Sequence, residues 1–222
     1  MIVRADNVTK KYERGRKGLV AVTPTNLTLE SGKLNVISGR SGGGKTTLLN
    51  MLAGLLEPSE GDVFYDDTNI YSLSDEEISH FRNKNIGYVP QGMSAINSLT
   101  VLENILLPAN IYSDEDKTER ALALLEKFNM QGMKDSFPDE LSGGELRRIA
   151  IARALINLPS VIYADEPTND LDNENARSVF ELLRDISRDG NTVVVVTHDQ
   201  TAFDYADIVY AMNEGKIEIN VQ

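Results

Sequence analysis

The chain has 222 residues, 41% hydrophobic and 25% charged, a composition typical of a soluble α/β domain, with room for one smaller lobe. Its 34 acidic and 22 basic residues give a net charge of −12, which argues against broad binding to nucleic-acid backbones. The absence of cysteine excludes disulfides and thiolate metal sites. The longest β-branched run, Val193 to Val196, is too short to cross a membrane, and Arg4 and Asp6 interrupt any signal peptide. Work at a membrane would therefore require recruitment by a partner.

The N-terminal part is predicted to contain short strands and one helix. Polar and apolar residues alternate at 26–29, which indicates a strand that ends at the turn Ser31-Gly32. Leucines at helical spacing indicate a helix at 45–56. Further strands are expected at 33–38, 63–65 and 86–89.

The middle of the chain has a different character. Helical periodicity dominates between 101 and 158, with helices expected at 119–128 and 146–158. The α/β alternation then returns, with a strand at 161–164, a helix at 176–187 and a Val-rich strand at 192–197. This order predicts an α/β core of residues 1–91 and 159–222 and a helical lobe inserted at about 92–158.

A glycine-rich stretch lies between the strand at 33–38 and the following helix. It matches the phosphate-loop pattern G-x-x-x-x-G-K-[ST] through Gly39, Arg40, Ser41, Gly42, Gly43, Gly44, Lys45 and Thr46. Glycines let backbone N–H groups turn toward an anion, and the helix N-terminus adds partial positive charge. Lys45 supplies a full charge for the β and γ phosphates, and Thr46 supplies a hydroxyl for magnesium. A flexible glycine linker is the alternative, and the strand-loop-helix context disfavours it.

Two acids, Asp165 and Glu166, end the strand at 161–164. In phosphate-loop ATPases an Asp at this place holds magnesium, and a Glu one residue later can polarise the attacking water. Many buried strands end in an acid, so the pair gains its weight from the phosphate loop upstream. Together the two motifs predict hydrolysis of ATP with Mg²⁺ as cofactor.

A second pair of glycines precedes the helix at 146–158, in the stretch Leu141, Ser142, Gly143, Gly144 and Glu145. Ser142 is expected to cap the helix, whose N-terminus then forms another anion site. With this stretch the chain resembles the ATP-binding-cassette ATPase family, whose signature is LSGGQ or LSGGE. The resemblance covers essentially the whole chain. It implies an α/β fold: a P-loop NTPase core with an N-terminal antiparallel β subdomain and an inserted helical subdomain.

The resemblance implies roles for further residues. Tyr12 matches the aromatic residue that stacks on adenine, and His198 matches the switch histidine at the γ phosphate. Gln91 matches the glutamine that reaches magnesium and the catalytic water. Asp172 lies in the D-loop, which crosses to another subunit in the family. Glu166 is then the expected general base, magnesium is held by Thr46, Gln91 and Asp165, and Thr47 completes the ATP contacts.

The resemblance also implies partners. In the family, the phosphate loop of one subunit and the signature of another enclose the same ATP, which implies a homodimer or pseudo-dimer of cassettes in the ATP-bound state. The stretches 85–91 and 99–108 resemble the macrolide-exporter and lipoprotein-releasing subfamily. This implies a separate transmembrane permease and a cytoplasmic cassette, peripheral on the inner face of the membrane. No nucleic-acid partner is expected.

Two alternatives stay open at this stage. One is a cassette ATPase of a non-transport machine, which the lack of sustained heptads disfavours. The other is an ATP-clamped scaffold, which an intact Glu166 disfavours.

The segment 92–112 is expected to line the groove that accepts a cytoplasmic helix of the permease. It joins the two lobes and carries more apolar side chains than a solvent loop needs, namely Met93, Ile96, Leu99 and Val101. The alternative is that these side chains complete the core of the helical lobe.

Overall fold

Two β-sheets organise the chain in the computed structural model, which describes residues 1–14, 17–92, 94–113 and 115–219. The smaller sheet is antiparallel in the order β2-β1-β4-β5. Its strands are β1 (Val3–Arg14), β2 (Lys17–Leu29), β4 (Glu60–Tyr65) and β5 (Thr68–Asn69). The antiparallel β subdomain is therefore confirmed.

The larger sheet has the order β10-β9-β3-β8-β7-β6 and is parallel except for the hairpin of β9 and β10. Its strands are β3 (Leu34–Ser38), β6 (Ile86–Val89), β7 (Val161–Asp165), β8 (Thr192–Thr197), β9 (Ile208–Asn213) and β10 (Lys216–Ile219). Every residue of β7 and β8 is buried, as expected for central parallel strands covered on both faces.

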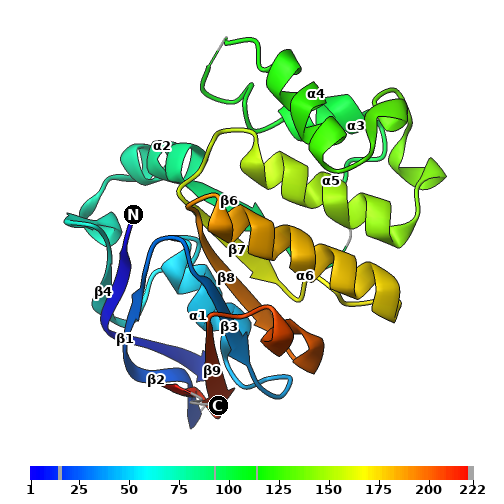
Figure 1. Cartoon of the computed structure of the whole chain (residues 1–222). Coiled ribbons are helices and arrows are strands. Elements are labelled where there is room, and N and C mark those ends of the chain that lie inside the picture. The colour runs from blue at the N-terminus through cyan, green and yellow to red at the C-terminus, as the bar shows by residue number, and fades with distance from the viewer. Residues whose placement is uncertain (15–16, 93, 114, 220–222) are drawn as a thin grey trace.

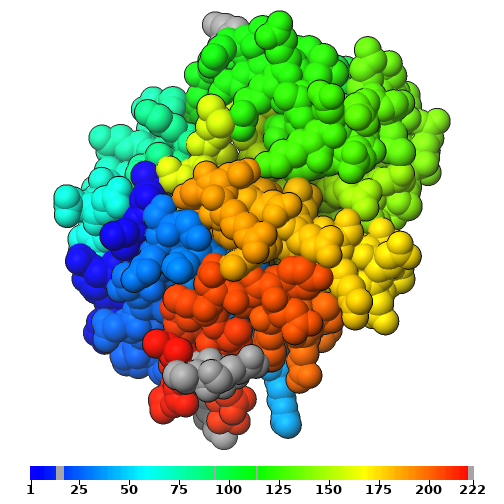
Figure 2. Space-filling model, viewed as in Figure 1, coloured from blue at the N-terminus to red at the C-terminus, as the bar shows by residue number. Residues whose placement is uncertain are grey.

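Helices cover both faces of the larger sheet (Figure 1). The helices packed on this sheet are α1 (Lys45–Leu52), α2 (Asp75–Asn85), α5 (Gly143–Leu155) and α6 (Asn173–Arg188), while α3 (Val101–Leu106) and α4 (Thr118–Lys127) pack on α5. One apolar core contains residues of α1, the small sheet and the large sheet. The second contains residues of α3, α4, α5, α6 and the large sheet. Figure 2 shows the helical part of the chain, in green, at the opposite end of the molecule from the red C-terminal strands. The predicted P-loop NTPase fold with an inserted helical part is confirmed.

Parallel pairing brings three strand ends to one edge of the larger sheet. Ser38, the last residue of β3, pairs with Thr197 at the end of β8. Asp165, the last residue of β7, pairs with Val196. The phosphate loop follows β3, Glu166 follows Asp165 at the end of β7, and His198 follows β8. The fold therefore gathers these residues in space although they are far apart in sequence.

Three helices differ from the predicted bounds by three residues or more, and one of them, expected at 176–187, spans Asn173–Arg188. The helix expected at 45–56 ends at Leu52, because Gly54 adopts a left-handed conformation with φ 68° and turns the chain away. The helix expected at 146–158 begins at Gly143, because Ser142 caps it and Glu145 completes a capping box. Within the described residues, no helix is long and apolar enough to span a membrane.

Candidate functional site

Close packing requires glycine at two positions of the phosphate loop. A Cβ on Gly39 would collide with the carbonyl oxygen of Met212, and one on Gly44 would collide with that of Ala21. Gly44 also has φ 99°, a conformation that favours glycine. The loop therefore lies directly against β2 and the end of β9, with α1 starting at its end.

The Lys45 ammonium lies folded back over the loop. Its Nζ donates to the carbonyl of Gly39 at 2.8 Å and to that of Arg40 at 3.3 Å. It also lies 3.5 Å from Oε1 of Glu166, and the residue is only 6% exposed. A buried ammonium held by two carbonyls and one carboxylate is positioned to exchange these contacts for phosphate oxygens.

Thr46 and Asp165 meet at the foot of the loop. The Thr46 hydroxyl donates to Oδ1 of Asp165 at 3.1 Å. Burial raises the pKa of the Asp165 carboxyl, the Thr46 hydrogen bond and the Lys45 charge oppose this, and the Glu166 charge adds to it. A hydroxyl and a carboxylate side by side suit Mg²⁺, a hard cation that takes few protein ligands and keeps several waters.

Glu166 and His198 form a contact between the ends of β7 and β8. Oε2 of Glu166 lies 2.9 Å from Nδ1 of His198 and accepts from the His198 backbone N–H at 3.2 Å. Glu166 has φ 44°, a conformation that is costly for a residue with a Cβ, and its N–H donates to the Val196 carbonyl at 2.8 Å. The carboxylate is therefore held between Lys45 and the histidine ring.

The loop that carries His198 is held by the loop that follows β7. Thr168 Oγ1 donates to Asp199 Oδ2 at 3.2 Å, and Asp199 caps the short helix that begins at Gln200. This contact ties the residue after His198 to the loop after Glu166. Thr168 and Asp199 were not among the predicted site residues, since neither belongs to a phosphate-binding motif.

A cavity of about 490 Å³ opens over the phosphate loop. The predicted site residues that line it are Tyr12, Ser41, Gly42, Gly43, Gly44, Lys45, Thr46, Thr47, Gln91 and Glu166. It also contains residues that the sequence did not indicate: Leu19, Val20, Ala21, Glu214 and Gly215. Leu19, Val20 and Ala21 lie at the cavity because β2 pairs with β1, with Leu19 opposite Tyr12. Glu214 and Gly215 lie there because the N–H of Gly215 donates to the Gly43 carbonyl at 3.0 Å.

The signature residues lie elsewhere. The hydroxyl and N–H of Ser142 both donate to Oε2 of Glu145, at 2.7 and 2.8 Å, which closes the capping box of α5 and lowers the pKa of Glu145. A Cβ on Gly144 would press on the Asn175 side chain. Asn175 in turn donates to Asp172, which caps α6 by accepting from two backbone N–H groups.

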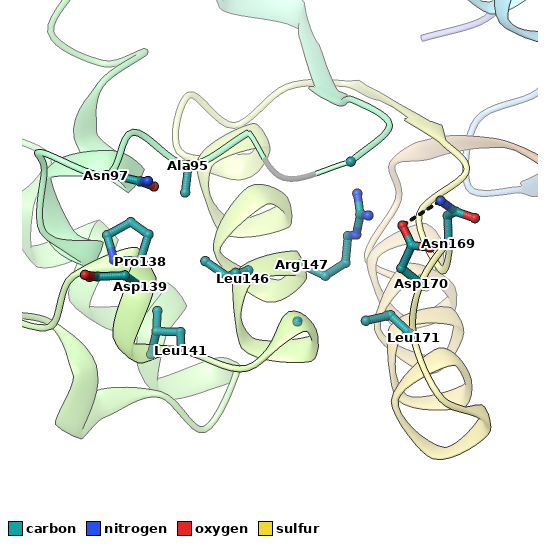
Figure 3. Close-up of a pocket in the computed structure, with 12 residues that line it drawn as sticks. Ala95, Asn97, Pro138, Asp139, Leu141, Leu146, Arg147, Asn169, Asp170 and Leu171 are labelled. Carbon is teal, nitrogen blue, oxygen red and sulfur yellow. Dashed lines mark hydrogen bonds between the residues drawn. The ribbon is translucent and has the colours of Figure 1, made fainter.

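Leu141 and Gly143 line a second cavity, of about 920 Å³. It lies between the chain after β6, the start of α5 and the loop after Glu166 (Figure 3). One subunit thus carries the phosphate loop and the signature in separate cavities, and the structure does not bring them together.

The fold, the phosphate loop and the acids at its foot define a phosphate-loop nucleotide hydrolase. The chain belongs to the ABC transporter family, whose model matches residues 22–169. The predicted activity is that of this family, so the chain is an ATPase that binds ATP and uses Mg²⁺.

Individual relatives agree with this assignment. The chain is 39% identical to the lipoprotein-releasing system ATP-binding protein LolD of Treponema denticola, over 98% of this chain and 97% of that protein. It is 36% identical to the macrolide export ATP-binding/permease protein MacB of Haemophilus ducreyi, over 97% of this chain and 31% of that protein. A solved dimeric ATP-binding cassette of Methanocaldococcus jannaschii, in a post-hydrolysis state with ADP and Pi, superposes with a TM-score of 0.87 at 36% identity, covering 99% of both chains.

Proposed function

We propose that this chain is the ATP-hydrolysing subunit that drives a separate membrane permease, with Glu166 as general base. The observation that carries the proposal is the contact series from Lys45 through Glu166 to His198, at 3.5 and 2.9 Å. The carboxylate can take a proton from water while the lysine charge stabilises the phosphate that leaves. His198 and Gln91 orient the water and the γ phosphate.

Mg²⁺ would be held by Thr46 and Asp165, which already share a hydrogen bond of 3.1 Å. Gln91, which lines the same cavity as Thr46, is proposed as the third ligand. The bound ion supplies charge that stabilises the transferring phosphoryl group. Backbone N–H groups of Gly42 to Thr47 cradle the phosphates at the N-terminus of α1.

The adenine base is proposed to lie on Tyr12. This residue, with Leu19 and Val20, forms an exposed apolar rim on one side of the cavity. Exposed apolar side chains beside a polar phosphate site suit a planar base, which gains from stacking and burial.

The signature is proposed to complete the site of a second subunit. Ser142 and Gly143 lie at the N-terminus of a long helix, which favours a phosphate, but they do not share a cavity with the phosphate loop of their own chain. A head-to-tail pair of cassettes satisfies both halves. The solved relative is itself a dimer, and Asp172 would lie near the crossing.

The core of residues 1–91 and 159–222 is proposed to bind nucleotide, and the helical lobe of about 92–158 to carry the signature. The relatives named above favour a permease of the lipoprotein-releasing or macrolide-exporting type. The permease would hold the cassette at the cytoplasmic face of the membrane.

The contact with the permease is proposed at an apolar groove of about 270 Å³ beside α2. Leu55, Ile111 and Tyr112 line it and are exposed, and Tyr88 also lines it. Three large exposed apolar side chains in one groove suit the apolar face of a helix.

The groove differs from the segment expected from the sequence. Val101 is fully buried in the helical core, so its assignment to a partner surface is wrong. Ile96 is exposed but does not line this groove, and Met93 lies outside the described residues. Among the described residues of the expected segment, only Ile111 and Tyr112 line the groove.

The test is phosphate release by the purified chain, alone and with its permease. Hydrolysis is expected to require Mg²⁺ and to rise when the permease is present. The Lys45→Ala variant is expected to lose both nucleotide binding and hydrolysis. Lys127→Ala is the matched control, because Lys127 lies on α4 and lines neither the nucleotide cavity nor the groove beside α2. Hydrolysis that persists in Lys45→Ala, or that is absent from the wild type, would refute the proposal.

A further inference from the structure

A buried arginine of α5 lies between the chain after β6 and the loop after Glu166. Arg147 is 6% exposed and lines the cavity of about 920 Å³. In Figure 3 its side chain extends from α5 toward the chain that follows β6, with Asn169 and Asp170 on its other side. None of the motifs considered above includes this residue.

The first contact of Arg147 fixes the peptide bond before Gln91. Its Nη1 donates to the Pro90 carbonyl at 3.0 Å. The Pro90 carbonyl and the Gln91 N–H belong to one planar peptide unit, so holding the oxygen also orients the backbone of Gln91. Gln91 reaches the nucleotide cavity.

The same helix holds the chain on the far side of Gln91. Arg153 donates from Nη1 to the Ser94 carbonyl at 2.7 Å and from Nη2 to the Ser94 hydroxyl. Both arginines extend from one continuous helix, so α5 fixes Pro90 and Ser94 relative to each other. The position of Gln91 therefore follows the position of α5.

The loop after Glu166 completes the surroundings of Arg147. Burial lowers the pKa of the guanidinium, and the Asp170 charge opposes this. The Asn169 side chain donates to Oδ2 of Asp170 at 2.8 Å. The guanidinium keeps its charge, because an arginine is not deprotonated in a protein. A buried charge with these neighbours is costly to displace, which favours one fixed geometry.

We propose that Arg147 is a positioning residue that ties Gln91 to the signature helix. Engagement of Ser142 by the partner subunit's ATP would then set the position of Gln91 in this subunit's own site. The path is short, since five residues of one helix span about 8 Å. The inference rests on the proposed function, in which Ser142 serves the site of the partner.

The first experiment replaces Arg147 with Met, which keeps a long apolar stem and removes the donors. The kcat for ATP is expected to fall about 10- to 100-fold, because a small displacement of a group that orients the attacking water costs this much. The KM is expected to stay within about twofold. ATP-dependent dimerisation in a Glu166→Gln background is expected to be unchanged, because Ser142 itself is untouched.

The matched control is Arg120→Met. Arg120 on α4 also donates to carbonyls of the signature helix region, at Leu155 and Ile156, both at 2.8 Å. It holds the opposite end of α5 from the phosphate-binding end. Arg120→Met removes donors to this helix but leaves the contacts to Pro90 and Ser94 in place, so its kcat is expected to stay within about twofold of the wild type.

The decisive measurement is a double-mutant cycle with Gln91→Ala. If Arg147 acts through Gln91, the double variant has the same kcat as Gln91→Ala alone. The inference is wrong if the two losses multiply. It is also wrong if Arg147→Met keeps the wild-type kcat, or if Arg120→Met loses as much kcat as Arg147→Met. Arg147→Lys, which keeps one donor, should recover part of the kcat, and it serves if the Met variant does not fold. A wild type that does not hydrolyse ATP would instead refute the proposed function.

Discussion

The hydroxyl of Tyr65 on β4 lies 2.8 Å from the hydroxyl of Tyr163 on β7, and both side chains are buried. Tyr65 donates to the carbonyl of Leu52, the last residue of α1, at 2.8 Å. Tyr163 must then donate to Tyr65. The helix that starts at the phosphate loop is thus joined to β7 at both ends, since Thr46 at its start contacts Asp165. Burial raises the pKa of both tyrosines, so both hydroxyls stay protonated.

This pair predicts an asymmetric loss of stability. Tyr65→Phe leaves the Leu52 carbonyl and the Tyr163 hydroxyl without their partner and should lower the free energy of unfolding by about 1–3 kcal/mol. Tyr163→Phe removes only a donor to Tyr65 and should cost less. Urea unfolding of the nucleotide-free protein measures both. Equal losses in the two variants would show that the Leu52 contact is not the dominant one.

Glu166→Gln is expected to abolish turnover and to keep ATP binding. The amide cannot take a proton from water, and loss of a general base costs about 10²- to 10⁴-fold in rate. The variant should accumulate as an ATP-bound dimer, which size-exclusion chromatography detects. Turnover at the wild-type rate would remove Glu166 from the mechanism.

Tyr12→Ala is expected to weaken ATP binding by about 1–3 kcal/mol, the range for base–aromatic stacking. Tyr12→Phe should be tolerated, because stacking on the base uses the face of the ring, which Phe keeps. Titration with a fluorescent ATP analogue gives both affinities. Unchanged affinity in the Ala variant would place the base elsewhere.

Asp165→Asn is expected to stabilise the nucleotide-free protein at neutral pH while it loses Mg²⁺-dependent hydrolysis. Burial raises the pKa of Asp165 in the folded state. The folded state therefore favours the protonated, neutral carboxyl. The stability that this group contributes is fully present below the unfolded pKa of about 3.9, and it is lost as the pH rises through the raised pKa of the folded state, where the buried carboxyl must ionise. The stability difference between variant and wild type should grow with pH. Unfolding by urea from acid to neutral pH checks this, and a difference that does not change with pH would contradict it.

Ile111→Glu is expected to prevent association with the permease and to leave the isolated subunit folded and able to bind ATP. The residue is exposed in the groove beside α2, so a charge there costs little until a partner helix must cover it. Leu122→Glu is the control, since Leu122 is an exposed leucine of the same lobe outside this groove. Co-purification with the permease compares the two. Normal assembly of the Ile111 variant would move the docking surface elsewhere.

Local chemistry made several features predictable. The phosphate loop can be identified in the sequence because its glycines, Lys45 and Thr46 are contiguous and bounded by a strand and a helix. Ser142 is recognisable as a cap because a cap and its helix are neighbours in sequence, and the structure confirms it. The β-branched run of β8 indicated a buried central strand for the same reason, and all of it is buried.

Contacts between residues of different helices and strands were decided by the tertiary structure alone. Leu19 reaches the nucleotide cavity because β2 pairs with the strand of Tyr12, and Gly215 reaches it because the β9–β10 turn packs on the phosphate loop. The sequence suggested a partner surface for Val101, but the residue is buried in the core because α3 packs on α5. The donation of Arg147 to Pro90 joins residues 57 positions apart. Such contacts depend on strand register and helix packing, which combine the preferences of distant segments, whereas the sequence reports each segment by itself.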